Sequence, residues 1–85
     1  MMETIQHLLA DNKFVLNCDG AEAVLQYRIS QSPTGTTIDF TKTYVPAEFR
    51  GKGFAEKLVR TGVAWAKQQG YEMQASCWYA EKFIH

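Results

Sequence analysis

Residues 45–55 read Val-Pro-Ala-Glu-Phe-Arg-Gly-Lys-Gly-Phe-Ala and separate two stretches of very different pattern. Before them, β-branched and aromatic side chains crowd residues 36–45, which is typical of a strand. After them, residues 53–69 place apolar side chains at positions 55, 58, 59, 62 and 66, the spacing of one helical stripe. The quoted stretch therefore predicts a turn that leaves a strand and opens an amphipathic helix.

Small residues leave the backbone nearly bare where this helix begins, at Gly51, Gly53 and Ala55. Free N–H groups and the positive end of the helix dipole suit an anion there, and Arg50 and Lys52 add formal charge. The alternative is a tight turn beside exposed bases, which is the commoner meaning of a Gly-Lys-Gly alone. The P-loop spacing is absent, and the dinucleotide fingerprint would need glycine at position 56, which is glutamate.

The rest of the chain predicts a mixed fold. Alternation of apolar and polar residues, with hairpin turns at residues 19–20 and 32–35, predicts strands before the helix. A short strand and a final helix follow it, whereas residues 1–12 are ambiguous, with one possible helical turn through Ile5, Leu8 and Leu9. The strands are predicted at residues 13–18, 23–29, 36–45 and 71–76, and the helices at 53–69 and 78–84.

These elements predict an α/β (α+β) fold. It contains an antiparallel three-stranded meander, a helix, a fourth strand parallel to the third, and a C-terminal helix. The helix between the third and fourth strands permits their parallel pairing, because parallel neighbours need a crossover connection.

Length and charge narrow the class of ligand. The chain has 85 residues, 46% hydrophobic and 21% charged, so we expect one globular domain over residues 1–85. Nine basic and nine acidic residues give zero net charge, which argues against a nucleic-acid partner. Residues 42–70 nevertheless carry six bases and two acids, a local charge of +4 that favours a small anionic ligand.

Two cysteines cannot supply a four-ligand zinc site, so no metal is expected. No apolar run approaches the ~18 residues of a transmembrane helix, so no membrane partner is expected. The N-terminus lacks the basic and apolar regions of a secretory signal. We expect a cytoplasmic monomer with reduced thiols.

Arg50, Gly53 and Ala55 lie at the spacing of a known motif. They resemble the pyrophosphate-binding motif of the GNAT acetyltransferase superfamily: Arg or Gln, two residues, Gly, one residue, then Gly or Ala. The wider chain resembles one small branch, the single-domain GNAT-like N-acetyltransferases, which consist of little beyond the acetyl-CoA site. The resemblance covers about residues 12–84 and rests on Asn-Lys-Phe at 12–14, Thr-Tyr-Val-Pro at 43–46, Arg-Gly-Lys-Gly at 50–53 and Ala-Ser-Cys-Trp-Tyr-Ala at 75–80.

The chain departs from this pattern in three ways. Relatives often carry His-Thr two to three residues before Val-Pro, where this chain has Lys42-Thr43, so a role for an imidazole does not carry over. The chain stops at His85, where relatives usually continue for several residues. It also lacks the N-terminal helices that shape the acceptor pocket of larger GNAT enzymes, which leaves the acceptor amine open.

The resemblance implies that acetyl-CoA is the cosubstrate and lies along the third strand and the start of the helix. Its pantetheine arm would bond to the strand backbone, and its diphosphate would lie on the amides of residues 51–55. A backbone N–H near Val45 would polarise the thioester carbonyl. The residues expected to bind acetyl-CoA are Thr43, Tyr44, Val45, Arg50, Gly51, Lys52, Gly53, Phe54, Ala55 and Lys57.

Cys77 and Tyr79 are the expected catalytic residues. Cys77 lies between a predicted strand and a predicted helix, whose dipole would lower the thiol pKa and favour the thiolate. A cysteine recurs there in the similar branch, which implies a nucleophile that accepts acetyl; an inert, buried thiol is the alternative. Tyr79 resembles the late tyrosine that protonates the leaving thiolate in many GNAT enzymes, although its ring could serve packing alone.

The remaining candidates weigh less. Glu48 could be a base in the loop but is expected to be a solvated charge, and Cys18 is assigned no role. His7 is expected on the surface without a partner. Trp65 and Trp78 are expected in the core or at its rim.

Together these residues predict an N-acetyltransferase that moves acetyl from acetyl-CoA to an unidentified amine, directly or through Cys77. A non-catalytic CoA-binding module is the alternative, favoured by the missing acceptor-side helices and by Lys42. In a third class, the chain is a structural domain and Arg-Gly-Lys-Gly is only a turn.

Overall fold

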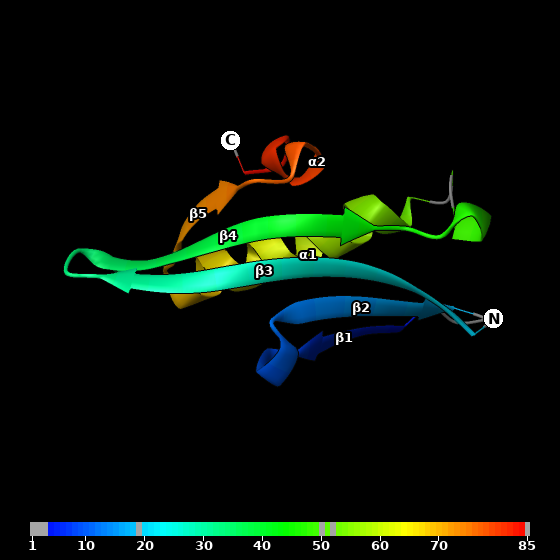
Figure 1. Cartoon of the computed structure of the whole chain (residues 1–85), viewed down its shortest axis with the longest axis horizontal. Helices are drawn as coiled ribbons and strands as arrows, with labels where there is room; N and C mark the ends of the chain where they lie inside the picture. The colour runs from blue at the N-terminus through cyan, green and yellow to red at the C-terminus, as the bar shows by residue number, and fades with distance from the viewer. Residues whose placement is uncertain (1–3, 19, 50, 52, 85) are drawn as a thin grey trace.

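The computed structural model describes residues 4–18, 20–49, 51 and 53–84. Within these residues the chain forms one five-stranded sheet in the order β1-β2-β3-β4-β5 (Figure 1). The strands are β1 (Thr4–Leu8), β2 (Lys13–Cys18), β3 (Ala21–Ser32), β4 (Gly35–Tyr44) and β5 (Glu72–Ala75). The helices are α1 (Phe54–Gln69) and α2 (Trp78–Glu81), with short 3-10 turns η1 (Leu9–Asp11) and η2 (Ala47–Phe49).

The meander of β2, β3 and β4 is antiparallel, and β5 pairs with β4 in parallel, as the sequence predicts. The β3–β4 hairpin runs further than predicted, since β3 reaches Ser32 and β4 starts at Gly35. Its far end is polar and carries no hydrophobic alternation, but the short turn keeps the strands in register. Figure 1 shows this hairpin projecting beyond the end of α1.

The first strand was not predicted. Ile5 and Leu8 belong to β1, an edge strand paired antiparallel with β2, and only Leu9 enters a helical turn, in η1. An isolated helical turn is unfavourable because one hydrogen bond fixes several residues. A strand that extends an existing sheet gains a full ladder of bonds, so the expected helical turn over these residues is wrong.

His7 in β1 corrects a second expectation. It is half-buried, and its Nε2 lies 2.6 Å from the hydroxyl oxygen of Tyr27. Its ring stacks on Phe14 with centroids 4.0 Å apart and meets Trp65 edge-on at 4.5 Å. His7 is therefore part of an aromatic cluster and has a partner. Trp65 lies at the rim of the core, as expected.

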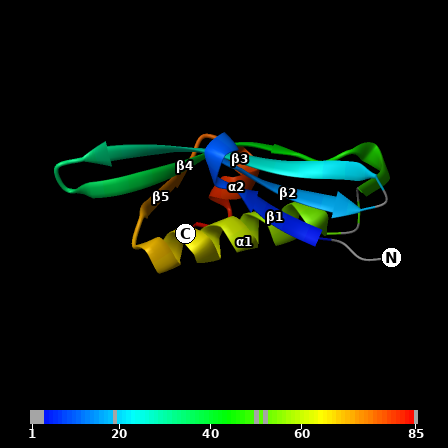
Figure 2. The same cartoon turned by 90° about the horizontal axis from the view of Figure 1, so that it is seen from below.

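The core lies between α1 and one face of the sheet (Figure 2). Gly62 explains the close fit, because a Cβ at this position would lie 2.9 Å from Leu25 and 3.0 Å from Phe40. Small residues thus let the helix approach the sheet closely. The buried members of the core on α1 are Phe54, Leu58, Val59, Val63 and Ala66.

The C-terminal helix is shorter than the predicted 78–84. After Glu81 the backbone makes i to i−3 bonds, from Phe83 N–H to the Ala80 carbonyl at 3.0 Å and from Ile84 N–H to the Glu81 carbonyl at 3.4 Å. Phe83 and Ile84 are half-buried and pack against the core. Their apolar pattern reflects this packing and not a continued α-helix.

The strands β4 and β5 part at a defined point. Their parallel register ends at the pair Phe40–Ala75, and the N–H of Cys77 then donates to the Phe40 carbonyl at 3.1 Å. Beyond it β4 continues to Tyr44, while the other chain turns into α2. The last residues of β4 therefore have no strand partner on that side among the described residues.

Candidate functional site

Two adjoining hollows lie where β4, α1 and α2 converge. One has a volume of about 220 Å³ and the other about 350 Å³, and both are lined by Val45, Ala55 and Tyr79. We call the combined depression the β4–α1 groove. Its other lining residues are Thr43, Phe49, Gly51, Gly53, Phe54, Cys77 and Trp78.

The end of the groove at α1 exposes bare backbone. Gly51 and Gly53 have φ angles of +83° and +77°, a left-handed conformation that favours glycine. A Cβ at either position would meet no atom within 4 Å, and Gly53 caps α1 without a side-chain hydrogen bond. The first N–H groups of an α-helix have no partner within the helix, so the start of α1 beside these uncrowded glycines suits an anion. Arg50 and Lys52, expected to bind the same anion, lie outside the described residues.

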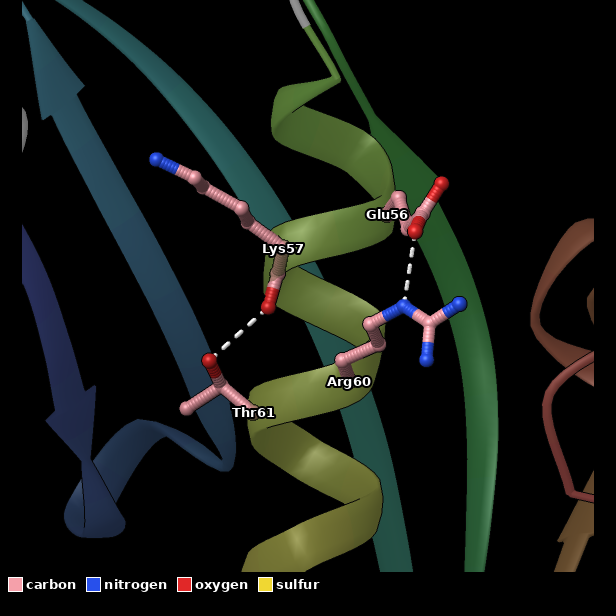
Figure 3. A network of polar contacts seen from close by, with 4 residues as sticks. All are labelled: Glu56, Lys57, Arg60 and Thr61. Atoms are coloured by element: carbon pink, nitrogen blue, oxygen red, sulfur yellow. Dashed lines mark hydrogen bonds and ion pairs between the residues drawn. The ribbon is translucent and has the colours of Figure 1, made fainter.

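Charged side chains on the first turns of α1 divide between its sides (Figure 3). Arg60 Nε donates to Glu56 Oε2 at 2.7 Å, an ion pair at i, i+4 spacing on α1. This pairing offsets the carboxylate nearest the anion site. Lys57 points to the other side of the helix and does not line the groove.

Cys77 is held at the bottom of the opening between β4 and β5. It is half-buried, and its Sγ lies 3.5 Å from Thr43 Oγ1. Burial alone would raise the pKa of the Cys77 thiol, but the Thr43 hydroxyl and the N–H groups of Ala80, Tyr79 and Thr43 lower it, and the net pKa shift is downward.

The lowered pKa of the Cys77 thiol has a different main cause from the helix dipole that the sequence predicts. The helix dipole expected at Cys77 is weak because α2 has 4 residues. The Cys77 side chain also makes no capping hydrogen bond to α2. The hydroxyl of Thr43, from the opposite strand, is the leading contribution that favours the thiolate.

Tyr79 lines both hollows of the groove. Burial raises the pKa of its phenol, the Glu56 carboxylate raises it further, and Arg60 acts in the opposite direction. The phenol therefore stays protonated near neutral pH and is able to donate a proton. Its ring also packs edge-on to Trp78, which lines the groove and is 73% exposed. The expectation that Trp78 lies in the core or at its rim is therefore wrong.

Two other predicted residues lie outside the groove. Tyr44 is 54% exposed, and its side chain lines a hollow on the opposite face of the sheet. Glu48 is exposed in η2 and does not line the groove. Cys18 is half-buried beside the core.

Comparison with known proteins then assigns the chain to a family. The sequence profile described as GCN5-related N-acetyl-transferase matches residues 13–85. The chain belongs to this family. Acetyl-CoA is the acyl donor typical of GCN5-related N-acetyltransferases (GNAT proteins).

Individual relatives agree with the assignment of this GNAT chain. It is 27% identical over 82 residues to Protein NATD1 of Xenopus tropicalis, which covers 94% of this chain and 72% of that protein. Protein NATD1 of Homo sapiens is 24% identical over 82 residues, covering 94% and 70%. The solution NMR structure of a GCN5-like candidate N-acetyltransferase from Staphylococcus aureus matches with a TM-score of 0.70 and 28% identity, covering 95% of this chain and 76% of that one.

The structure shows a pair of hydrogen bonds beside the groove that the sequence analysis did not predict. Ser76 donates from its N–H and its hydroxyl to the two carboxylate oxygens of Asp39, at 2.8 and 2.9 Å. These residues are 37 positions apart, and the motif at residues 75–80 that contains Ser76 says nothing of Asp39. Only the parallel register of β4 and β5 predicts their meeting, because it pairs Asp39 with Gln74, two residues before Ser76.

No helix in the described part of this GNAT chain is long and apolar enough to cross a membrane. The same residues contain no group of three His, Cys, Asp or Glu side chains that could hold a metal ion.

Proposed function

We propose that the chain is an N-acetyltransferase that uses acetyl-CoA in the β4–α1 groove and transfers acetyl to an amine. The observation that carries the proposal is the continuity of the groove. It leads from the bare backbone at Gly53, which suits a diphosphate, to the thiol of Cys77.

The groove matches the chemistry of coenzyme A at both ends. The free N–H groups at the start of α1 would hold the diphosphate. The pantetheine arm is extended and rich in amides, so it would pair with the open edge of β4 as an added strand does. This edge is available beyond Phe40–Ala75, where β5 has ended. Val45 and Thr43 line the same edge and would lie beside the thioester.

Direct transfer needs few protein groups. The amine nitrogen attacks the thioester carbonyl, a C–N bond forms and the C–S bond breaks. A backbone N–H near Val45 would stabilise the oxyanion. The surplus proton of the amine passes to solvent, and the Tyr79 phenol protonates the CoA thiolate that leaves.

A second route passes through Cys77. Its thiolate attacks the thioester, acetyl-Cys77 forms, and CoA leaves with a proton from Tyr79. The amine then attacks acetyl-Cys77, the C–S bond breaks to release the Cys77 thiolate, and the surplus proton of the amine returns through solvent to the Tyr79 phenolate. The lowered pKa of the Cys77 thiol and its position beside Thr43 support this route.

A CoA-binding module without catalysis is the second candidate. The described residues that line the groove include neither a carboxylate nor an imidazole that could act as a general base. Lys42 does not replace one, because its side chain lines a different hollow and not the groove.

Intact-protein mass spectrometry after incubation with acetyl-CoA tests both routes. The covalent route predicts one added acetyl group on wild type and none on Cys77→Ala, with CoA affinity retained in the variant. Cys77→Ser should be nearly inactive on this route, because a hydroxyl is a far weaker nucleophile. Turnover by all three proteins without an acetylated intermediate would establish direct transfer. Tight CoA binding with no turnover of any amine would favour the module.

A further inference from the structure

A separate hollow of about 200 Å³ lies on the face of the sheet opposite α1. Phe14 and Leu25 are buried beneath α1, so their strand neighbours Lys13, Val24 and Gln26 point the other way. We call this depression the lysine hollow. It is lined by Lys13, Val24, Gln26, Lys42 and Tyr44.

The register of the strands explains why two lysines meet here. Lys13 of β2 pairs with Gln26 of β3, and Gln26 pairs with Lys42 of β4. The three residues form one row across the sheet, so the two lysines lie two strand spacings apart, about 10 Å. A small anion above Gln26 is within reach of both flexible ammonium groups.

The charge of the lysine hollow is not neutralised by its surroundings. No ion pair is found for Lys13 or Lys42 among the described residues, and no carboxylate lines the hollow. The nearest acid along β4 on this face, Asp39, bonds to Ser76 and forms no ion pair with Lys13 or Lys42 among the described residues. Two ammonium groups, the Gln26 amide and the Tyr44 phenol can all donate, which is the donor set that binds phosphate or carboxylate.

The lysine hollow lies back to back with the reactive end of the β4–α1 groove. Lys42 and Tyr44 flank Thr43, whose hydroxyl lies 3.5 Å from Cys77 Sγ. Successive residues of a strand point to opposite faces, so β4 alone separates the two depressions. Beyond Phe40–Ala75 β4 has no strand partner on that side among the described residues, so it is the outermost strand between the two faces there.

We infer that the lysine hollow holds the anionic end of the acceptor. The acceptor would be a small molecule that carries both an amine and a phosphate or carboxylate. Its charged end would lie between Lys13 and Lys42, and its amine would reach around β4 to the acetyl group beyond the residues that pair with the pantetheine arm. This inference rests on the proposed function for the amine and on the lysine hollow for the charge.

Matched probes separate the two parts. O-phosphoethanolamine and β-alanine carry the anion, and ethanolamine carries the same kind of amine without it. NMR titration of the labelled protein reports binding without turnover, and acetylation assays with acetyl-CoA report turnover. The test variant is Lys13→Gln/Lys42→Gln, which removes both charges and keeps much of the chain length. The control is Lys67→Gln, on the exposed side of α1.

The anionic amines should shift the backbone signals of Lys13, Gln26 and Lys42, and ethanolamine should not. Turnover needs longer amines, because the chain has to pass around β4: kcat/KM for 6-aminohexanoate or 6-aminohexyl phosphate should exceed that for 6-amino-1-hexanol by about tenfold or more, mostly through KM. The double variant should lose this preference while its CoA affinity stays unchanged, and Lys67→Gln should keep it. High salt should weaken the preference, because these charges are near solvent. Comparison of the two anionic probes tells phosphate from carboxylate.

Equal shifts with ethanolamine, shifts that persist in the double variant, or shifts caused by CoA instead would overturn the inference. Failure of every amine to accept acetyl would count against the proposed transferase and would leave the titration to decide on the lysine hollow. Both assays use the full chain.

Discussion

The carboxylate of Asp39 accepts both the N–H and the hydroxyl of Ser76, and this pair fixes the point where β4 and β5 separate. The next residue is Cys77, whose own N–H bonds to Phe40. The position of the thiol is therefore set from β4, through two consecutive residues. A change at Asp39 should act on Cys77 without touching the groove.

We expect Asp39→Ala to lower the free energy of unfolding by about 1 kcal/mol, because its two hydrogen bonds are solvent-exposed. The same change should alter the rate at which iodoacetamide modifies Cys77, since Ser76, the residue before it, is no longer held by Asp39. Ser76→Ala removes only the hydroxyl bond and should have the smaller effect in both assays. Urea unfolding and alkylation kinetics measure the two. An unaltered alkylation rate in Asp39→Ala would show that the Asp39–Ser76 pair does not position Cys77.

Gly53→Asn tests the diphosphate site. Asparagine tolerates the left-handed backbone, so the variant should fold, with stability reduced by no more than about 1 kcal/mol. Its side chain would enter the open space beside the first turn of α1 and should weaken CoA binding tenfold or more. Gly70→Asn is the matched control, since Gly70 caps the other end of α1 with φ +75° and similar open space. Calorimetry should show normal CoA affinity for the control. Equal affinities in all three proteins would remove the diphosphate from this end of the helix.

Thr43→Val should raise the pKa of the Cys77 thiol, because the valine side chain has no hydroxyl to donate to the thiolate. The pH profile of alkylation by iodoacetamide should move to higher pH, and the rate at neutral pH should fall. Thr43→Ser retains a hydroxyl and should restore most of the wild-type profile. A profile that ignores both changes would mean that the N–H groups of Tyr79 and Ala80 carry the effect.

His7 should make stability depend on pH. Burial lowers its pKa from 6.5 in the folded state, so the unfolded chain binds the proton more readily. Its contribution is therefore present above pH 6.5 and is lost as the pH falls from there through the lowered folded pKa. Urea unfolding followed by the fluorescence of Trp65, which contacts His7, should show wild type losing stability over this window. The His7→Gln curve should be flatter there. Parallel curves would assign the pH dependence to other groups.

Local patterns predict most of the fold, and the errors have physical causes. Alternation locates the middle of β3, and the apolar stripe locates α1, because each buries one face. The alternation of Phe14 and Leu16 also locates β2, although Val15 between them is buried too. The strand β1 is too polar and too short to show a period, and its formation depends on the exposed edge of β2. The polar end of the β3–β4 hairpin likewise forms because of its turn and register.

The candidate site divides in the same way. A contiguous motif predicts the bare backbone at Gly51 and Gly53, because a glycine in the sequence indicates a position without a side chain and often with positive φ. Contacts between distant segments, such as Cys77 with Thr43, need the register of β4 and β5 before they can be seen. The lysine hollow depends on three strands at once. From the sequence, Lys42 only marks the position where relatives often carry histidine. Its place in one row with Lys13, which suggests an anion site, is visible only from the strand register.

The parallel pairing of β4 with β5 also fixes the order in which the molecule can be completed. Neighbouring strands of the meander meet through short turns, whereas Thr43 and Cys77 are 34 positions apart and meet only after α1 has crossed the sheet. Distant contacts are slower to form because they close a longer loop. We expect the end of the groove at Thr43 and Cys77 to form last. In a chain still on the ribosome, the antiparallel sheet should form before Cys77 reaches its position beside Thr43. In refolding experiments, CoA binding should recover more slowly than the circular dichroism signal of secondary structure. Coenzyme A should therefore bind only to fully folded molecules.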